Sequence, residues 1–299
     1  MRILVTGKNG QLGQSINKLI NIETKIENNP SSNEFIFVGR EELDLSNNSS
    51  IINYFDNHDK FDIVINSAAY TAVDQAEEEQ ELANQVNHLA VKQLAGIVKE
   101  QKARLIHIST DYVFNGESDK PYIETSETNP INVYGKSKLA GEKALQAVMP
   151  MNAVIIRTSW VYSEYGNNFV KTMLRLGKER DGISVVGDQI GSPTYATDLA
   201  SVILEIIKNK EFREMGQVTQ VYHYSNKGEI SWYDFTKEIF KLEKMDCKVS
   251  PIESKDYSNS TARPHYGVMS KQKIKQQLEL TIPYWKKSLA NCLQEIKKS

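Results

Sequence analysis

The sequence predicts an α/β protein with a Rossmann-like, doubly wound parallel sheet and a smaller C-terminal lobe. Three observations carry this prediction. Short apolar runs alternate with amphipathic helical segments over the first half of the chain, the first run ends in a glycine turn, and the alternation loosens after Tyr162. Strands that are apolar on both faces are typical of a parallel sheet covered by helices on both sides. The right-handed crossover rule then favours a doubly wound order.

The individual elements follow from where the apolar runs and the helical spacings fall. We expect strands at 1–6, 35–38, 62–66, 104–109 and 153–156. We expect helices at 11–21, 51–55, 77–101, 136–148, 199–207 and 232–242, and a polar loop at 28–33. A Rossmann domain is therefore predicted at 1–160 and a smaller lobe at 161–299, with some segments of the lobe returning to the first domain.

Composition and charge argue against several classes of protein. The 36 Lys and Arg residues nearly balance the 38 Asp and Glu residues, so a nucleic-acid partner is not expected. No apolar run approaches the ~20 residues of a membrane span, and the start of the chain lacks the shape of a signal peptide, which favours the cytoplasm. Cys247 and Cys292 cannot form a disulfide framework, and the five histidines lack metal-site spacing, so we expect no dedicated metal site.

The first turn carries the pattern Gly-x-x-Gly-x-x-Gly at Gly7, Gly10 and Gly13, enclosing Gln11 and Leu12. Glycine allows a tight turn and lets backbone N–H groups approach a pyrophosphate at a helix N-terminus. The last glycine lets the helix pack close to the sheet. The position between the first strand and the first helix predicts nucleotide binding, and the spacing resembles that of the extended short-chain dehydrogenase/reductases.

Residues after the second and third strands continue this resemblance. Arg40 stands where a cation accepts an adenosine 2′-phosphate, which favours NADPH, although NADH stays open. Asp44 and Leu45 resemble the superfamily pair that lies against the adenine. The segment containing Ala68, Ala69 and Tyr70 resembles its small-residue stretch beside the cofactor, so residues 1–160 are expected to bind NAD(P).

A Tyr-x-x-x-Lys spacing at Tyr134 and Lys138 places both side chains on one face of a helix, one turn apart. A nearby ammonium favours the phenolate and makes the tyrosine a stronger acid. Thr110 ends a strand upstream and completes a carbonyl-reducing set. The same spacing recurs at Tyr233 and Lys237, but an aromatic helix start surrounds Tyr233, which is better interpreted as packing.

The chain as a whole resembles the dTDP-4-dehydrorhamnose reductases. The segments that carry this resemblance span most of the sequence: 71–77, 109–114, 132–142, 157–162, 166–173 and 262–264. The resemblance implies NADPH-dependent reduction of the 4-keto group of dTDP-4-dehydro-L-rhamnose to dTDP-L-rhamnose, with residues 161–299 mainly binding the substrate.

The resemblance also assigns residues to roles. It implies that Thr110, Tyr134 and Lys138 are catalytic. It implies cofactor contacts by Gly10, Gln11, Leu12, Asp44, Leu45, Ala69, Tyr70 and Thr71, to which the glycine turn and the second and third strands add Gly7, Gly13, Arg40 and Ala68. Val73, Asp111, Tyr112 and Trp160 would line the sugar-nucleotide pocket, together with Thr110.

Some features depart from the family pattern or leave alternatives open. Some members have His at the position of Tyr70, and some pair through magnesium, whose ligands are not found in this sequence; a monomer and a homodimer both stay open. The acidic run at 77–81 is interpreted as a solvated helix start. A 4,6-dehydratase would have an acidic pair after the threonine, where Tyr112 stands here. An epimerase shares the same core residues, and a regulatory subunit of this fold, as in methionine adenosyltransferase, need not keep them.

Overall fold

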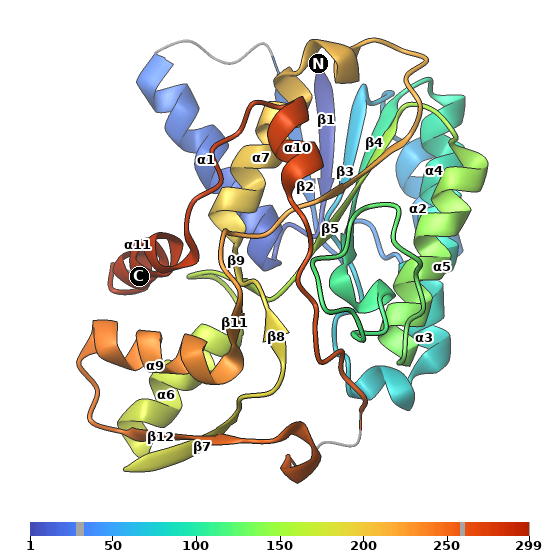
Figure 1. Cartoon of the computed structure of the whole chain (residues 1–299). Coiled ribbons are helices and arrows are strands. Elements are labelled where there is room, and N and C mark those ends of the chain that lie inside the picture. Colours follow the sequence, from blue (N-terminus) through green and yellow to red (C-terminus); the bar gives the residue numbers. More distant parts are fainter. Residues whose placement is uncertain (28–32, 258–260, 299) are drawn as a thin grey trace.

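A six-stranded sheet in the order β10-β5-β4-β3-β1-β2 forms the larger part of the molecule (Figure 1). The computed structural model describes residues 1–27, 33–257 and 261–298. All five strand pairs of this sheet are parallel. Its strands are β1 (Arg2–Thr6), β2 (Glu34–Val38), β3 (Ile63–Asn66), β4 (Arg104–Thr110), β5 (Ala153–Thr158) and β10 (Gln220–His223). The predicted fold class is confirmed.

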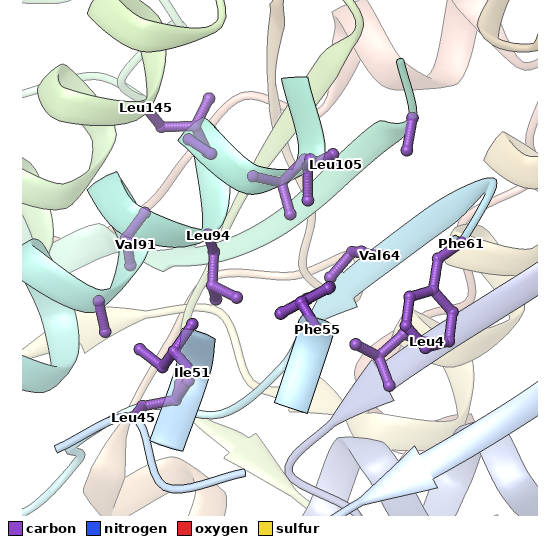
Figure 2. Close-up of a cluster of buried hydrophobic side chains, with 14 of the residues drawn as sticks. Leu4, Leu45, Ile51, Phe55, Phe61, Val64, Val91, Leu94, Leu105 and Leu145 are labelled. Atoms are coloured by element: carbon purple, nitrogen blue, oxygen red, sulfur yellow. The ribbon is translucent and has the colours of Figure 1, made fainter. Parts of the chain in front are cut away.

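Helices cover both faces of the sheet (Figure 1). One layer contains α2 (Asn48–Asp56), α4 (Ala90–Glu100) and α5 (Val133–Val148), and the other contains α1 (Gln11–Glu27) and α7 (Ala196–Lys208). Side chains alternate along β1 between the two cores, because Leu4 joins the first and Ile3 and Val5 join the second. Figure 2 shows the first core, where Ile51 of α2 and Leu94 of α4 pack beneath the strands.

The chain returns to this sheet late in the sequence. Strand β10 pairs with β5 from Gln220 opposite Val154 to His223 opposite Arg157. The short helix α10 (Gln272–Gln277) places Ile274 in the same core as α1 and α7. These returning segments bring the second half of the chain against the first, while the boundary at 160 stays a prediction.

The smaller lobe has a third core, to which Tyr162, Phe235 and Trp285 contribute. Its strands pair two by two: β6 (Val161–Tyr162) with β9 (Thr194–Tyr195), β7 (Gly182–Val186) with β12 (Lys248–Ile252), and β8 (Ile190–Gly191) with β11 (Ile230–Ser231). Its helices are α6 (Phe169–Glu179), α9 (Trp232–Glu243) and α11 (Trp285–Ile296), whereas α8 (Lys210–Arg213) follows α7 and packs Phe212 against the core of the large sheet. Across the described residues, no helix is both long and apolar enough to span a bilayer.

The helix predicted at 77–101 is present over residues 80–100, but it is not α-helical throughout. The structure has a 3-10 turn at Gln75–Glu77, α3 (Gln80–Asn84), a π turn at Gln85–Leu89 and then α4. Asn87 lies in the π turn. The Asn87 side-chain amide accepts a hydrogen bond from the Tyr70 N–H and donates to the Tyr70 carbonyl and the Ser137 hydroxyl. These contacts stabilise the π turn, and apolar spacing in the sequence cannot predict them.

Other boundaries differ by a few residues. Helix α5 begins at Val133 because the Asn132 side chain caps it by accepting a hydrogen bond from the Gly135 N–H at 2.8 Å. Short 3-10 turns lie at Asp111–Val113 and Ser254–Asp256. The loop predicted at 28–33 lies outside the described residues except for Asn33.

Candidate active site

A cavity of about 800 Å³ opens at the carboxyl ends of the central strands, between the sheet and the smaller lobe. Ligands of open α/β sheets bind at this edge, where the strand order changes direction next to β1. The predicted site residues that line it are Gly7, Gly10, Gln11, Leu12, Arg40, Asp44, Leu45, Ala68, Ala69, Tyr70, Thr71, Val73, Thr110, Asp111, Tyr112, Tyr134, Lys138 and Trp160. The structure therefore brings together residues that are far apart in the sequence.

The glycine turn between β1 and α1 has room only for glycine. Gly7 has φ +75°, and a Cβ there would lie 3.0 Å from the Ala68 nitrogen. A Cβ on Gly13 would lie 2.3 Å from the Gly7 carbonyl oxygen. Gly13 thus lies behind the cavity wall and allows the close packing that holds the turn, as the sequence predicts for the last glycine.

The wall beyond β2 is polar and exposed. The Arg40 side chain is 74% exposed, and its Nε lies 3.4 Å from Asp44 Oδ2. Burial raises the pKa of Asp44, but hydrogen bonds from the Ser46 N–H and hydroxyl and the charge of Arg40 outweigh it, so the net shift is downward. An ionised Asp44 beside an exposed guanidinium is suited to a ligand with both hydroxyl and phosphate groups.

Two residues of the acidic run have specific partners. Glu77 Oε1 accepts a hydrogen bond from the Val133 N–H at the start of α5, and Glu79 Oε2 accepts one from the Tyr70 hydroxyl at 2.9 Å. The interpretation of this run as only a solvated helix start is therefore wrong for Glu77 and Glu79. They tie the segment to α5 and to the cavity wall at Tyr70.

The three predicted catalytic side chains come from β4 and α5. Thr110 ends β4, and its hydroxyl accepts a hydrogen bond from the Tyr112 N–H and donates one to Asp111 Oδ1 at 3.1 Å. The Tyr134 side chain lies close enough to Thr110 for the Thr110 hydroxyl to affect the pKa of Tyr134. Lys138 lies one turn further along α5, and its Nζ donates to the Ile108 carbonyl at 2.7 Å. All three are buried and line the cavity.

Burial dominates the electrostatics of this set. It raises the pKa of Tyr134 above its usual value, and the neighbouring Thr110 hydroxyl opposes this only in part, so the expected shift toward the phenolate is wrong for this structure. It lowers the pKa of Lys138 to about 8, and the charge of Glu142 opposes it. It also raises the pKa of Asp111 to about 7. A protonated Tyr134 at neutral pH is the form that can donate a proton.

A buried ion pair supports this end of the cavity from behind. Arg157 Nη2 on β5 lies 2.7 Å from Glu142 Oε2 on α5, and their side chains are 6% and 2% exposed. The Ser109 hydroxyl, directly before Thr110, donates to Glu142 Oε1. Sequence reasoning missed this pair because its members belong to different elements. The pair ties the end of β4 to the helix that bears Tyr134 and Lys138.

Trp160 lines the cavity from the junction of the two lobes, in a conformation that large residues rarely adopt. Its φ is +48°, and its ring stacks on that of Trp232 with centroids 3.5 Å apart. A Cβ on Gly191 would lie 2.6 Å from the Trp160 ring, so only glycine fits there. Trp232 also lines the cavity and was missed, because its aromatic neighbours in the sequence predict packing alone.

The second Tyr-x-x-x-Lys spacing lies elsewhere. Tyr233 is half-buried outside the cavity lining, and the Lys237 ammonium lies 5.1 Å from the centre of its ring. By contrast, Gly166, Asn167 and Asn168 of the smaller lobe line the cavity although no role was predicted for them. In the sequence, only their place in a segment typical of the reductase family indicated a functional role.

A family model described as the RmlD substrate binding domain matches residues 1–298. The chain belongs to this family. A dTDP-4-dehydrorhamnose reductase from Aggregatibacter actinomycetemcomitans is 40% identical to this RmlD-family chain, over 97% of each protein.

Solved structures agree with that membership. A dTDP-4-dehydrorhamnose reductase from Clostridium acetobutylicum has a TM-score of 0.90 and 38% identity, covering 99% of the RmlD-family chain and all of its own. One from Bacillus anthracis in complex with NADP has a TM-score of 0.88 and 38% identity, covering 98% and 99%. Within the described part of the RmlD-family chain, no group of three or more His, Cys, Asp or Glu side chains is arranged to hold a metal ion.

Proposed function

We propose that this RmlD-family chain reduces the 4-keto group of dTDP-4-dehydro-L-rhamnose to dTDP-L-rhamnose with NADPH. The observation that carries the proposal is that one cavity joins the glycine turn to the buried set of Thr110, Tyr134 and Lys138. Relatives named for this activity match the chain over nearly their full length, which supports the substrate class.

The residues around the glycine turn fit a dinucleotide. A Cβ at Gly7 or Gly13 would collide with the backbone of Ala68 or of Gly7, so only glycine lets the turn pack this closely. The N-terminus of α1 offers N–H groups and a favourable dipole for a pyrophosphate. Arg40 and Asp44 would hold the adenosine end, and the Arg40 charge favours the 2′-phosphate of NADPH over NADH. When bound, the cofactor supplies a hydride.

The chain's own residues then handle the proton. Tyr134, which burial keeps protonated, would donate its proton to the C4 oxygen of the substrate. Thr110 would position that oxygen through its hydroxyl. Lys138 would hold the nicotinamide ribose, and its positive charge would stabilise the phenolate that remains on Tyr134.

The substrate side of the cavity belongs to both parts of the molecule. We assign Val73, Asp111 and Tyr112 of the first domain, and Trp160 at the junction, to the sugar nucleotide. Residues 1–160 would then bind mainly the cofactor and residues 161–299 mainly the substrate, with β10, α7 and α10 packed into the first domain.

The test is to follow NADPH oxidation by the purified chain with dTDP-6-deoxy-L-lyxo-4-hexulose and to identify the product. Formation of dTDP-L-rhamnose with one NADPH consumed per product supports the proposal. Turnover without net NADPH consumption would instead indicate an epimerase. NADPH binding without turnover of this sugar would show that another keto sugar is the substrate.

A further inference from the structure

The side chain of Gln11 forms its hydrogen bonds with the smaller lobe, although Gln11 belongs to the glycine turn. Its Nε2 donates to the Val161 carbonyl at 3.2 Å. Its Oε1 accepts hydrogen bonds from the Ser163 hydroxyl at 2.9 Å and from Asn168 Nδ2 at 3.0 Å. Among the described residues, the hydrogen-bond partners of this amide are Val161, Ser163 and Asn168, so it connects the start of α1 to the smaller lobe rather than to the sheet.

The segment that receives Gln11 is held firmly by its own contacts. Ser163 is fully buried, and Asn168 caps α6 by accepting a hydrogen bond from the Lys171 N–H. Lys171 Nζ donates to the carbonyls of Glu164 and Gly166 at 2.8 and 3.1 Å. Because these contacts hold the segment in place, it can fix the position of the Gln11 side chain.

A second contact ties the same segment to the helix that follows the turn. Lys18 on α1 lies 2.7 Å from Glu164 Oε1, and the Tyr195 hydroxyl donates to Glu164 Oε2 at 3.0 Å. The Glu164 side chain is 4% exposed. The first two turns of α1 are therefore held by the smaller lobe at two points, Gln11 and Lys18.

We propose that Ser163 and Asn168 are positioning residues for the cofactor, which act through Gln11. They fix the first turn of α1, where Gln11 and Leu12 line the cavity, and so make the affinity for the dinucleotide depend on the smaller lobe. The inference rests on the proposed function insofar as the dinucleotide is NADPH. Ser163 lies behind the cavity wall, so its effect on the cofactor has to pass through another residue.

Ser163→Ala removes one hydrogen bond to Gln11 and leaves the cavity lining intact. The net value of one such bond predicts an NADPH dissociation constant raised about 2- to 10-fold in a fluorescence titration. Affinity for dTDP, measured separately by calorimetry, should stay unchanged. The matched control is Thr172→Ala, because Thr172 donates to the Asn168 carbonyl at 3.0 Å and does not reach Gln11. It should leave the NADPH affinity unchanged.

A double-mutant cycle with Gln11→Ala separates positioning from general destabilisation. If Ser163 acts through Gln11, Ser163→Ala has little further effect on NADPH affinity once Gln11→Ala is present. An equal loss with and without Gln11→Ala overturns the proposal, and so does a parallel loss of NADPH and dTDP affinity. Absence of NADPH binding to the unaltered chain would instead contradict the proposed function itself.

Asn168→Asp provides a second variant should Ser163→Ala fold poorly. Aspartate keeps the acceptor that caps α6 but removes the N–H donor to Gln11 Oε1 and to the Ser163 carbonyl. A loss of NADPH affinity that disappears once Gln11→Ala is present supports the inference. A loss that persists shows direct repulsion of the dinucleotide by the new carboxylate, which lines the cavity, and overturns it. Unchanged NADPH affinity in this variant overturns it.

Discussion

The two ends of the cavity are built differently. At the chemical end, Tyr134 and Lys138 are buried, and the ion pair behind them, Glu142 with Arg157, is almost fully enclosed. At the adenosine end, Arg40 and Asp44 form a longer contact of 3.4 Å, with 74% and 30% of their side chains exposed. Both ends contain a cation beside a carboxylate, but only one of them is shielded from water.

The difference matters because burial decides what such a contact does. Removing one partner of an enclosed pair leaves a charge without solvent or counterion, which typically costs ~3–5 kcal/mol. An exposed pair is screened and typically contributes ~0–1 kcal/mol. We therefore expect the chemical end to be rigid and intolerant of change and the adenosine end to be adjustable, and the following variants test that expectation.

Tyr134→Phe should have the largest effect. The ring is retained and the proton donor is lost, so kcat should fall by about 10²–10⁴-fold while NADPH binding survives. Steady-state kinetics and a cofactor titration measure the two quantities. Near-normal turnover would mean that another group, with Asp111 the nearest acid, supplies the proton.

Tyr233→Phe is the control for that variant. It belongs to the same kind of spacing, with Lys237, but lies outside the cavity lining. We expect its kcat to stay within about twofold of the unaltered chain. A loss comparable with that of Tyr134→Phe would reverse the assignment of the two motifs.

Glu142→Gln tests the enclosed pair. It leaves the Arg157 guanidinium without its carboxylate, so the free energy of unfolding should fall by about 3–5 kcal/mol in chemical denaturation. Glu179→Gln is the matched control, because Glu179 pairs with Arg175 at the same 2.7 Å on an exposed helix face. Its effect should stay below about 1 kcal/mol. Equal effects of the two variants would remove the basis of the comparison.

Lys138 gives the chemical end a pH dependence. Burial lowers its pKa to about 8, the Glu142 carboxylate raises it, and His107 lies close enough for Lys138 to lower the pKa of that imidazole. The ammonium is lost as pH rises through about 8, so kcat/KM should decline above that pH. A profile that stays level well above pH 8 would show that the charge on Lys138 is not needed.

The sequence predicts the parts of the site that depend on local spacing. The glycine turn, the Tyr134–Lys138 pair and the strand that ends in Thr110 each lie within one short segment, and the structure brings them to one cavity. Their chemistry follows from residue type and separation along one element. The parallel sheet can be predicted equally well, because buried strands appear in the sequence as continuous apolar runs.

Contacts between distant segments could not be predicted in this way. Glu142 meets Arg157, and Gln11 meets Ser163, only after the chain has folded back on itself. The π turn around Asn87 lies inside a helix whose apolar spacing gives no sign of it. The pKa of Tyr134 was misjudged for the same reason, since the spacing supplies the ammonium but not the depth of burial.

Trp160→Ala probes the junction between the two ends and should have an intermediate effect. Loss of an apolar wall should lower kcat/KM for the sugar nucleotide about 10- to 100-fold, with little change in NADPH affinity. Trp160 is only half-buried and stacks on Trp232, which is itself half-buried, so stability should change less than the ~3–5 kcal/mol typical of a core aromatic residue. A drop in melting temperature of that size would favour a core role over the pocket.

Arg40→Ala should have the smallest effect, and only on one cofactor. NADPH has the 2′-phosphate that a guanidinium can bind, and NADH lacks it, so the dissociation constant for NADPH should rise several-fold while that for NADH barely moves. The exposed side chain also predicts that the difference shrinks as salt is raised, because water and ions screen the contact. Arg40→Lys should recover part of the loss, since it keeps the charge but not the two-pronged geometry. An equal loss of affinity for both cofactors, independent of salt, would mean that Arg40 shapes the adenosine end by packing. The adenosine end would then resemble the chemical end more closely than its exposure suggests.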